Sequence, residues 1–166
     1  DVDTDVGDFG IRYIGSFIDK FEQVPGGEFS EMAAQQASGA IPADIPIDGF
    51  GDLLGMNGNY DEKHRLRLSW SKGPWGATLT GLRKGSFYQS SLTLSDGTRF
   101  VIPSMTVMDL TVDYRFNLKN SAARIRFAVK NVADERAPTA DRYYGFFADA
   151  HQDLGRNFYV DFRVSL

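Results

Sequence analysis

The sequence predicts an all-β fold built from antiparallel, up-and-down strands. Apolar and polar residues alternate with a period of two in six segments, and a strand places successive side chains on opposite faces. No segment shows the periodicity of a strong amphipathic helix. The connections between the six segments alternate between short and long, as expected of a meander. The length of 166 residues suits one domain.

Three strands are predicted in the first half of the chain. The first covers 8–22 and alternates only in part. The second, 64–70, alternates leucine and tryptophan with arginine and serine. The third, 75–88, begins with a clear alternation and then weakens. Between the first two strands, we expect no more than one or two helical turns, over 30–38.

Three further strands are predicted in the second half, over 107–116, 123–130 and 157–166. All three alternate along their whole length. In the last strand, Phe158 and its apolar neighbours share one face, whereas Asp161 and the other polar residues share the opposite face. Each of these strands therefore has one apolar and one polar surface.

The connections favour a membrane barrel. Short turns over 72–74 and 117–122 alternate with long connections over 23–62, 93–104 and 133–156. In a meander, all the long connections then lie at one end. Loops longer than about 15 residues are uncommon in compact soluble domains. Transmembrane β-barrels combine short turns at one end with long loops at the other, so we predict the C-terminal portion of such a barrel.

Charged residues occupy the polar faces of the strands. They are Arg65, Arg67, Asp109, Asp113, Arg115, Arg124, Arg126, Lys130, Asp161 and Arg163, with His64 counted as chargeable. A barrel in lipid turns such residues toward its lumen, whereas a soluble sandwich turns them toward water. Trp70 and Trp75 flank the first short turn. They fit either an aromatic girdle at the membrane interface or two anchors of a soluble core.

Three segments near the C-terminus carry a resemblance to a known family. They read RIRFAVKNVAD (124–134), ADRYYGFF (140–147) and DLGRNFYV (153–160). An N-x-x-D motif after the penultimate strand, a loop, and a Gly-Arg-aromatic start of the last strand resemble the end of a TonB-dependent outer-membrane receptor. The terminal alternation also resembles the family's assembly signal, which usually ends in Phe or Trp where this chain has Leu166.

The resemblance implies a 22-stranded barrel filled by an N-terminal plug that contacts TonB. The chain, 1–166, has six predicted strands and no plug-like domain, whereas the smallest membrane barrels have eight strands. Open strand edges are not tolerated in lipid. We therefore expect a second chain that carries the plug and the remaining strands.

The same resemblance implies a location and a function. We expect a place in the outer membrane of a Gram-negative bacterium, in contact with lipid and lipopolysaccharide, with the C-terminus on the periplasmic side and the long connections outside. The receptor would bind a scarce solute at its loops and import it with energy delivered through TonB. Two alternatives remain at this point: a soluble, lectin-like β-sandwich that binds ligands, and a fragment of a passive porin.

Five residues of the last connection are the candidate ligand-binding residues: Tyr143, Tyr144, Phe146, Phe147 and His151. Aromatic side chains on a loop can stack on a sugar or hold an apolar ligand. They can equally pack on neighbouring loops. The expected solute is small, such as a saccharide, a peptide or a metal chelate.

The first long connection is strongly acidic. Over 23–62 it contains seven acidic residues and no Lys or Arg: Glu28, Glu31, Asp44, Asp48, Asp52, Asp61 and Glu62. Such a loop would disfavour anionic solutes. Alternatively, it serves solubility or binds divalent cations that bridge it to lipopolysaccharide.

No enzyme is predicted. The chain has no Cys, and neither His64 nor His151 lies near a nucleophile motif. We expect no catalytic residues, no metal site and no cofactor. The net charge of -4 argues against a nucleic-acid partner. The arginines of the polar faces either contact the plug or pair with neighbouring aspartates.

Overall fold

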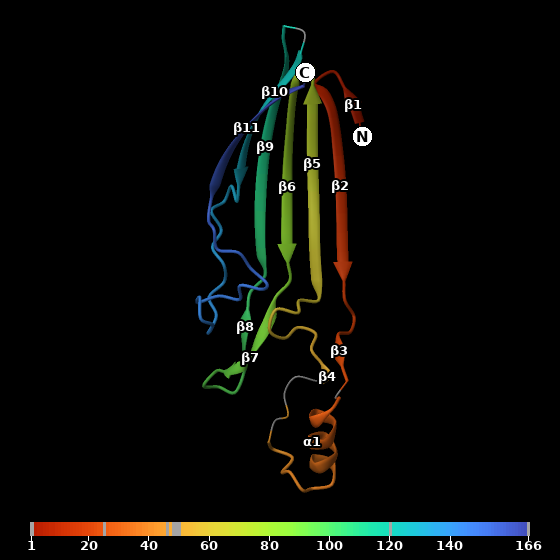
Figure 1. The fold of residues 1–166 in the computed structure, drawn as a ribbon, viewed down its shortest axis with the longest axis vertical. Coiled ribbons are helices and arrows are strands. Elements are labelled where there is room, and N and C mark those ends of the chain that lie inside the picture. Colours follow the sequence, from red (N-terminus) through yellow and green to blue (C-terminus); the bar gives the residue numbers. More distant parts are fainter. Residues whose placement is uncertain (1, 25, 46, 48–50, 120, 166) are drawn as a thin grey trace.

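A seven-stranded antiparallel sheet dominates the computed structural model (Figure 1), which describes residues 2–24, 26–45, 47, 51–119 and 121–165. Its strand order is β1-β2-β5-β6-β9-β10-β11. The strands are β1 (Val2–Thr4), β2 (Gly7–Phe17), β5 (Glu62–Lys72), β6 (Trp75–Lys84), β9 (Met105–Leu118), β10 (Ser121–Lys130) and β11 (Asn157–Ser165). The prediction of an all-β, antiparallel fold is confirmed. Within the described residues the sheet stays open, because β1 and β11 do not pair with each other.

Smaller elements lie in the long connections. A two-stranded ladder joins β3 (Glu22–Gln23) to β4 (Gly51–Asp52), and a hairpin joins β7 (Phe87–Thr93) to β8 (Arg99–Ile102). Helix α1 (Glu28–Ala37) has ten residues and is longer than the one or two turns predicted over 30–38. No helix among the described residues has the length and apolar character needed to cross a membrane.

The strict alternation of short and long connections is confirmed. The three short turns join residues that pair directly: Thr4 with Gly7, Lys72 with Trp75, and Leu118 with Ser121. The long connections cover 18–61, 85–104 and 131–156. In Figure 1 the N- and C-termini lie at the end with the short turns, and α1 lies beyond the opposite end.

Two predicted boundaries are wrong at the third strand. The segment 75–88 is interrupted after Lys84, where the Gly85 N–H donates to the carbonyl of Glu62, the first residue of β5, at 2.9 Å. A Cβ on Gly85 would lie 2.8 Å from Glu62 Cγ, so a larger residue would not fit without movement. The predicted loop over 93–104 contains strand β8, which ends just before Pro103. The predicted first strand, 8–22, ends at Phe17, and short strand β1 adds one strand to the six predicted.

The register gives the sheet one apolar and one charged face. One apolar row crosses six strands through Ile11, Leu68, Leu79, Leu110, Val129 and Phe158. A charged row on the other face passes through Asp113, Arg126 and Asp161. The assignment of His64 to the charged face is wrong. It alternates in phase with Leu66 on the apolar side, where its Nδ1 lies 2.7 Å from the Tyr13 hydroxyl.

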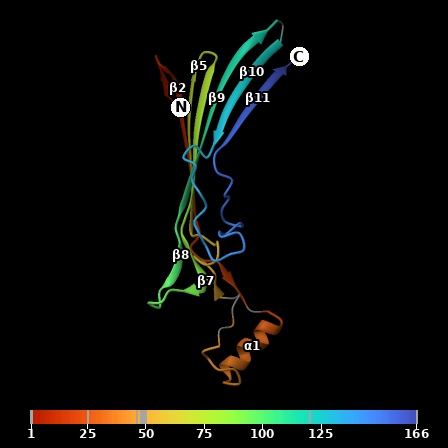
Figure 2. The same ribbon diagram turned by 90° about the vertical axis from the view of Figure 1, so that its left-hand side faces the viewer.

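The sheet is curved, and the charged face is on its hollow side. Figures 1 and 2 show a trough, with β2 and β11 on opposite sides. A hollow of about 700 Å³ lies between strands β2 and β10. Its charged lining residues are Asp8, Arg67, Asp113, Arg115 and Arg126. We call this charged surface the concave face, and the apolar surface the outer face.

A cluster of buried apolar residues in the described part of the chain lies among the long connections. It consists of Phe87, Ile102, Ala140, Phe147 and Ala150. Ile102 is completely buried. On the sheet, Met105, Ala123 and Val129 are also buried, whereas many large apolar side chains of the outer face are exposed.

Candidate functional site

The candidate site is the assembly of long connections at one end of the sheet. Its centre is the final connection, 131–156, which packs on the β7–β8 hairpin. The Phe147 ring meets the Phe87 ring edge-on, with centroids 5.0 Å apart. The His151 ring stacks on the same Phe87 at 5.6 Å. These contacts exclude water from the junction between the hairpin and the connection.

A buried glutamine holds the same junction. The Gln89 side chain is almost fully buried, with 1% exposure. Its Nε2 donates to the Asp141 carbonyl at 2.9 Å, and its Oε1 accepts from the Asp141 backbone N–H at 3.0 Å. The side-chain amide of Gln89 therefore hydrogen-bonds to both the N–H and the carbonyl of Asp141, as a residue of a neighbouring β-strand would. This pair of bonds fixes the position of the final connection.

The first long connection is also hydrogen-bonded to the hairpin. The Tyr88 backbone N–H donates to the Gly55 carbonyl at 2.8 Å, and Asn57 N–H donates to the Tyr88 carbonyl at 2.9 Å. The Asn57 side chain also donates to the Ser90 hydroxyl and accepts from the Ser90 backbone N–H. Strand β7 of the hairpin therefore contacts both the first and the final connection.

The N-x-x-D motif and the Gly-Arg start of the last strand meet at the base of the final connection. Asn131 is buried, and its side chain makes two hydrogen bonds to the Glu135 backbone, each 2.8 Å long. Asp134 Oδ1 accepts from the Arg156 backbone N–H at 2.7 Å. Asn131 and Asp134 both have a positive φ, a conformation that Asn and Asp adopt more readily than most residues. The two sequence motifs thus form one closed base.

An ion pair spans the same connection above its base. Arg136 binds Asp153 with two hydrogen bonds, of 2.8 Å and 2.6 Å, and the Ala137 backbone N–H donates to Asp153 at 2.9 Å. These donors, the Arg136 side chain first, lower the pKa of Asp153 from 3.8 to about 2. Asp153 therefore remains an acceptor well below neutral pH.

The five predicted ligand-binding residues divide into two groups. Phe147 and His151 are buried, with 3% and 2% exposure, in the packing just described. Tyr143 and Tyr144 are exposed to 94% and 69%, and Phe146 is half-buried. The Tyr143 and Tyr144 rings meet edge-on with centroids 5.0 Å apart, and Phe146 lies 6.3 Å from Tyr144. Tyr143, Tyr144 and the half-buried Phe146 therefore form the part of this set that a solute can reach.

His151 is buried, but its ring makes no hydrogen bonds. Neither ring nitrogen has a hydrogen-bond partner in the structure. Burial lowers the pKa of His151, and the Lys84 ammonium lowers it further. The imidazole is therefore held neutral and packs against Phe87 as an aromatic ring.

Two residues of the assembly were missed by the sequence reasoning. Gln89 was missed because it lay at the edge of a weak strand signal. Lys84 donates its Nζ to the Ala150 carbonyl and so ties the end of β6 to the final connection. Only the three-dimensional contact identifies either role, since both residues are separated from their partners by more than 50 positions.

A shallow hollow of about 360 Å³ lies beside the assembly. Its lining includes Leu54, Asp61, Phe87, Tyr88 and Val101, and it lies between the first connection and the hairpin. It combines an aromatic wall with one carboxylate. A small uncharged solute could be held there by stacking and one hydrogen bond.

The acidic character of the first connection is visible in α1. Glu28 and Glu31 occupy its first turn, and its last turn has no basic residue. Figures 1 and 2 show α1 projecting away from the sheet. Asp48, another of the predicted acidic residues, lies outside the described residues. In the described part of the chain, no three His, Cys, Asp or Glu residues lie close enough together to hold a metal ion.

Comparison with known proteins gives no relative: no protein-family model, no curated protein and no solved structure matches the chain.

Proposed function

We propose that the chain is the C-terminal part of an outer-membrane receptor of the TonB-dependent type, which binds a scarce solute at its long connections and imports it. The observation that carries the proposal is the arrangement of the two faces. Apolar side chains cover the outer face, whereas charged side chains line the hollow. This is the reverse of a soluble β-sandwich, in which the apolar face is enclosed.

The exposure of the outer face supports contact with lipid. Ile11 is 75% exposed, Phe158 64% and Val160 70%. Soluble monomers rarely expose a continuous apolar surface larger than a few hundred Å². The apolar rows of this sheet cross six strands. A hydrocarbon environment removes the cost of exposing them.

Aromatic residues near the short turns support the same placement. Trp75 packs on Tyr114 with centroids 4.6 Å apart, and Tyr114 stacks on Phe116 at 5.9 Å. Phe116 contacts Phe162 at 6.4 Å. The Trp75 side chain remains half exposed. Such a band on the outer face fits an aromatic girdle at the periplasmic interface.

The two open edges of the sheet imply further strands. In lipid, the free backbone groups of β11, and those of the part of β2 that β1 does not cover, would have no hydrogen-bond partners. A second chain with the remaining strands and the plug would satisfy these groups and connect the assembly to TonB. The final connection would then offer Tyr143, Tyr144 and Phe146 to an extracellular solute.

Extraction of the native assembly in detergent tests this proposal. Outer membranes are dissolved in a nonionic detergent, the 18.5 kDa chain is captured, and the intact masses of all co-purified chains are measured. We expect one larger chain in a one-to-one ratio, with sequence for a plug. Recovery of the chain as a folded, water-soluble monomer would overturn the proposal in favour of a soluble binding domain. A conducting pore without dependence on TonB would favour a passive porin.

A further inference from the structure

The concave face carries a large excess of positive charge. By the strand register, ten basic residues share this face: Arg12, Lys63, Arg65, Arg67, Lys84, Arg115, Arg124, Arg126, Lys130 and Arg163. On β2, β5, β6, β9, β10 and β11, four acidic residues share it: Asp8, Asp109, Asp113 and Asp161. The whole chain has a net charge of -4, so the positive charge is concentrated on one surface of an acidic protein.

The register places like charges directly opposite each other. Arg12 pairs with Arg67 across β2 and β5, and Lys63 pairs with Lys84 across β5 and β6. Arg124 lies between Arg115 on β9 and Arg163 on β11. Like charges directly opposite on neighbouring strands destabilise a sheet. Three separate rows of this kind on one face indicate that a counter-charge is supplied from outside the sheet.

The aspartates of the face compensate only part of this charge. Lys130 has a close partner in Asp109, at 2.6 Å. In contrast, Arg126 lies 3.7 Å from Asp113, and Arg124 lies 3.8 Å from Asp161, with no hydrogen bond between the partners in either pair.

Other basic residues of the face have no partner at all in the described part of the chain. The side chains of Arg12, Lys63, Arg65, Arg67 and Arg163 make no hydrogen bond or ion pair there. In addition, the buried Nε atoms of Arg124 and Arg126 and Oδ2 of Asp113 have no hydrogen-bond partner. The face thus has unused donors at several places.

We infer that the concave face binds a polypeptide segment rich in Asp and Glu. This inference rests on the proposed function and deepens it, because it gives the chemistry of the partner segment that fills the interior. The spacing of the three rows favours a polypeptide over a compact anion. The rows meet β9 near Met105, Asp109 and Arg115, which spans about 33 Å at about 3.3 Å per residue. No single small anion covers that distance.

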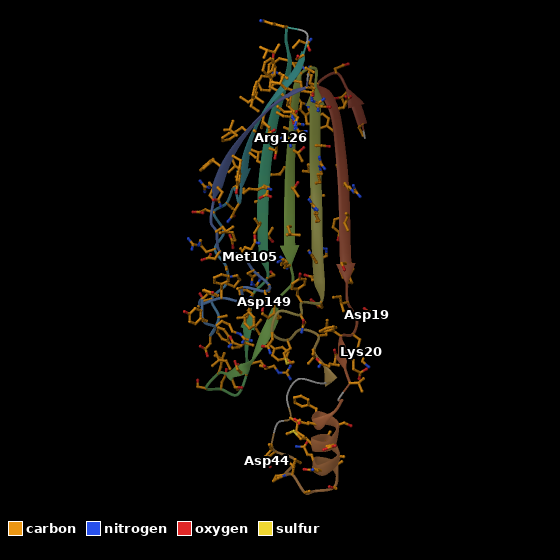
Figure 3. The ribbon with its side chains drawn as sticks, viewed as in Figure 1. Asp19, Lys20, Asp44, Met105, Arg126 and Asp149 are labelled. Atoms are coloured by element: carbon orange, nitrogen blue, oxygen red, sulfur yellow. The ribbon has the colours of Figure 1, made fainter. Side chains whose placement is uncertain are left out.

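Glu28 and Glu31 of helix α1 do not fill this role. Helix α1 lies beyond the end of the sheet that is opposite to the short turns (Figures 1 and 2). Figure 3 labels Arg126 in the half of the sheet nearer the short turns and Met105 at the opposite end. The charged rows therefore extend over the sheet itself, where the occupant has to lie.

Binding of an acidic peptide tests the inference. The full chain, held in a nonionic detergent that covers the outer face, is titrated with a fluorescent oligo-glutamate peptide of about 20 residues, which spans the rows when extended. We expect binding that weakens as the ionic strength rises from about 0.01 M to about 0.15 M, since the Debye length falls from about 30 Å to about 8 Å. Oligo-lysine of the same length should not bind. Absence of oligo-glutamate binding at low salt would overturn the inference.

Matched variants locate the binding surface. The double variant R67Q/R163Q removes two arginines without partners from the concave face, and we expect about tenfold weaker peptide binding. The variant K63Q/R65Q tests the same face independently. The control R83Q/R156Q removes the same charge elsewhere, because Arg83 faces outward beside Glu62 and Arg156 precedes β11. An equal loss in the control would overturn the inference.

Two further readouts separate an acidic partner from other roles. The melting temperature of R67Q/R163Q should stay the same or rise, because like-charge repulsion is removed. A lower melting temperature with unchanged peptide binding would mean that these arginines are structural, against the inference. Displacement of the peptide by tripolyphosphate at equal total charge would indicate a compact anion site, also against it. Co-purification with the larger chain is measured separately, so the inference can fail while the proposed function stands.

Discussion

Asp134 and Arg156, which are 22 positions apart, close the base of the final connection: Oδ1 of Asp134 accepts the Arg156 backbone N–H at 2.7 Å. Gly155 makes this closure possible. It has a φ of +66°, and a Cβ at this position would lie 3.1 Å from Asp134 Oδ1. The contact joins the end of β10 to the start of β11 and sets the direction in which the whole connection leaves the sheet.

Replacement of Asp134 should open this base. We expect D134A to lose the bond to Arg156 and the favourable positive φ, at a cost of about 1–2 kcal/mol in the free energy of unfolding. D134N should retain most of the stability, because Asn keeps an acceptor and tolerates this backbone conformation. Proteolysis of the final connection measures the effect. The control D149A removes an exposed carboxylate of the same connection, and equal proteolysis in D149A and D134A would contradict the assignment.

Gln89 should be critical for the junction between the hairpin and the final connection. Q89L removes three hydrogen bonds, one to the Ser91 hydroxyl and two to Asp141, and leaves the Asp141 backbone groups without partners, so we expect a loss of about 2–4 kcal/mol. Amide hydrogen exchange at Asp141 should accelerate strongly, whereas exchange in β10 should not change. Unchanged exchange at Asp141 would show that the junction does not depend on this side chain. The conservative variant Q89E keeps the acceptor and should have an intermediate effect.

The final connection should respond to acid at an unusually low pH. The pKa of Asp153 is lowered to about 2, so its interactions with Arg136 and Ala137 contribute fully above 3.8, its ordinary value. The contribution is lost as pH falls from 3.8 toward 2. The NMR shift of the Ala137 amide, which donates to Asp153, should therefore titrate with a midpoint near 2. A midpoint at the ordinary value would mean that the ion pair is not formed, and D153N should abolish the titration.

The exposed tyrosines should affect solute binding without affecting stability. Tyr143 and Tyr144 are largely exposed, so Y143A/Y144A should change the melting temperature little. Solute uptake by cells should fall about tenfold or more if both rings stack on the solute. The control F147A should instead destabilise the connection by about 3 kcal/mol, because Phe147 is buried against Phe87. Normal uptake in Y143A/Y144A would show that Tyr143 and Tyr144 do not bind the solute.

The sequence predicts the sheet well and the connections poorly, for a physical reason. In a strand with one apolar and one polar face, apolar and polar residues alternate along the sequence. The last three strands can therefore be predicted from their own residues alone. In the connections, burial depends on distant partners. Tyr143 and Phe147 look equivalent in the sequence, yet one is exposed and the other packs on Phe87. Gln89 carries no local signal of its role.

The break between strands β6 and β7 at Gly85 was also not predicted from the sequence. The sequence predicts one strand over 75–88, whereas in the structure β6 ends at Lys84 and β7 begins at Phe87. In contrast, the N-x-x-D and Gly-Arg motifs were singled out through a family resemblance, and the structure shows a backbone conformation that restricts their residue types. Asn131, Asp134 and Gly155 all have a positive φ, which few residue types adopt readily.

Contact between lipid and the outer face is the central claim, and the sequence allows a direct measurement. The chain contains no Cys, so single cysteines can be introduced one at a time along β11 and labelled with a fluorophore. The labelled protein is then reconstituted into vesicles of brominated lipids, which quench the fluorophore on contact. We expect strong quenching at positions 158, 160 and 162 and weak quenching at 159, 161 and 163, a period of two that matches the apolar face. Equal, weak quenching at all six positions would contradict a lipid-facing outer surface.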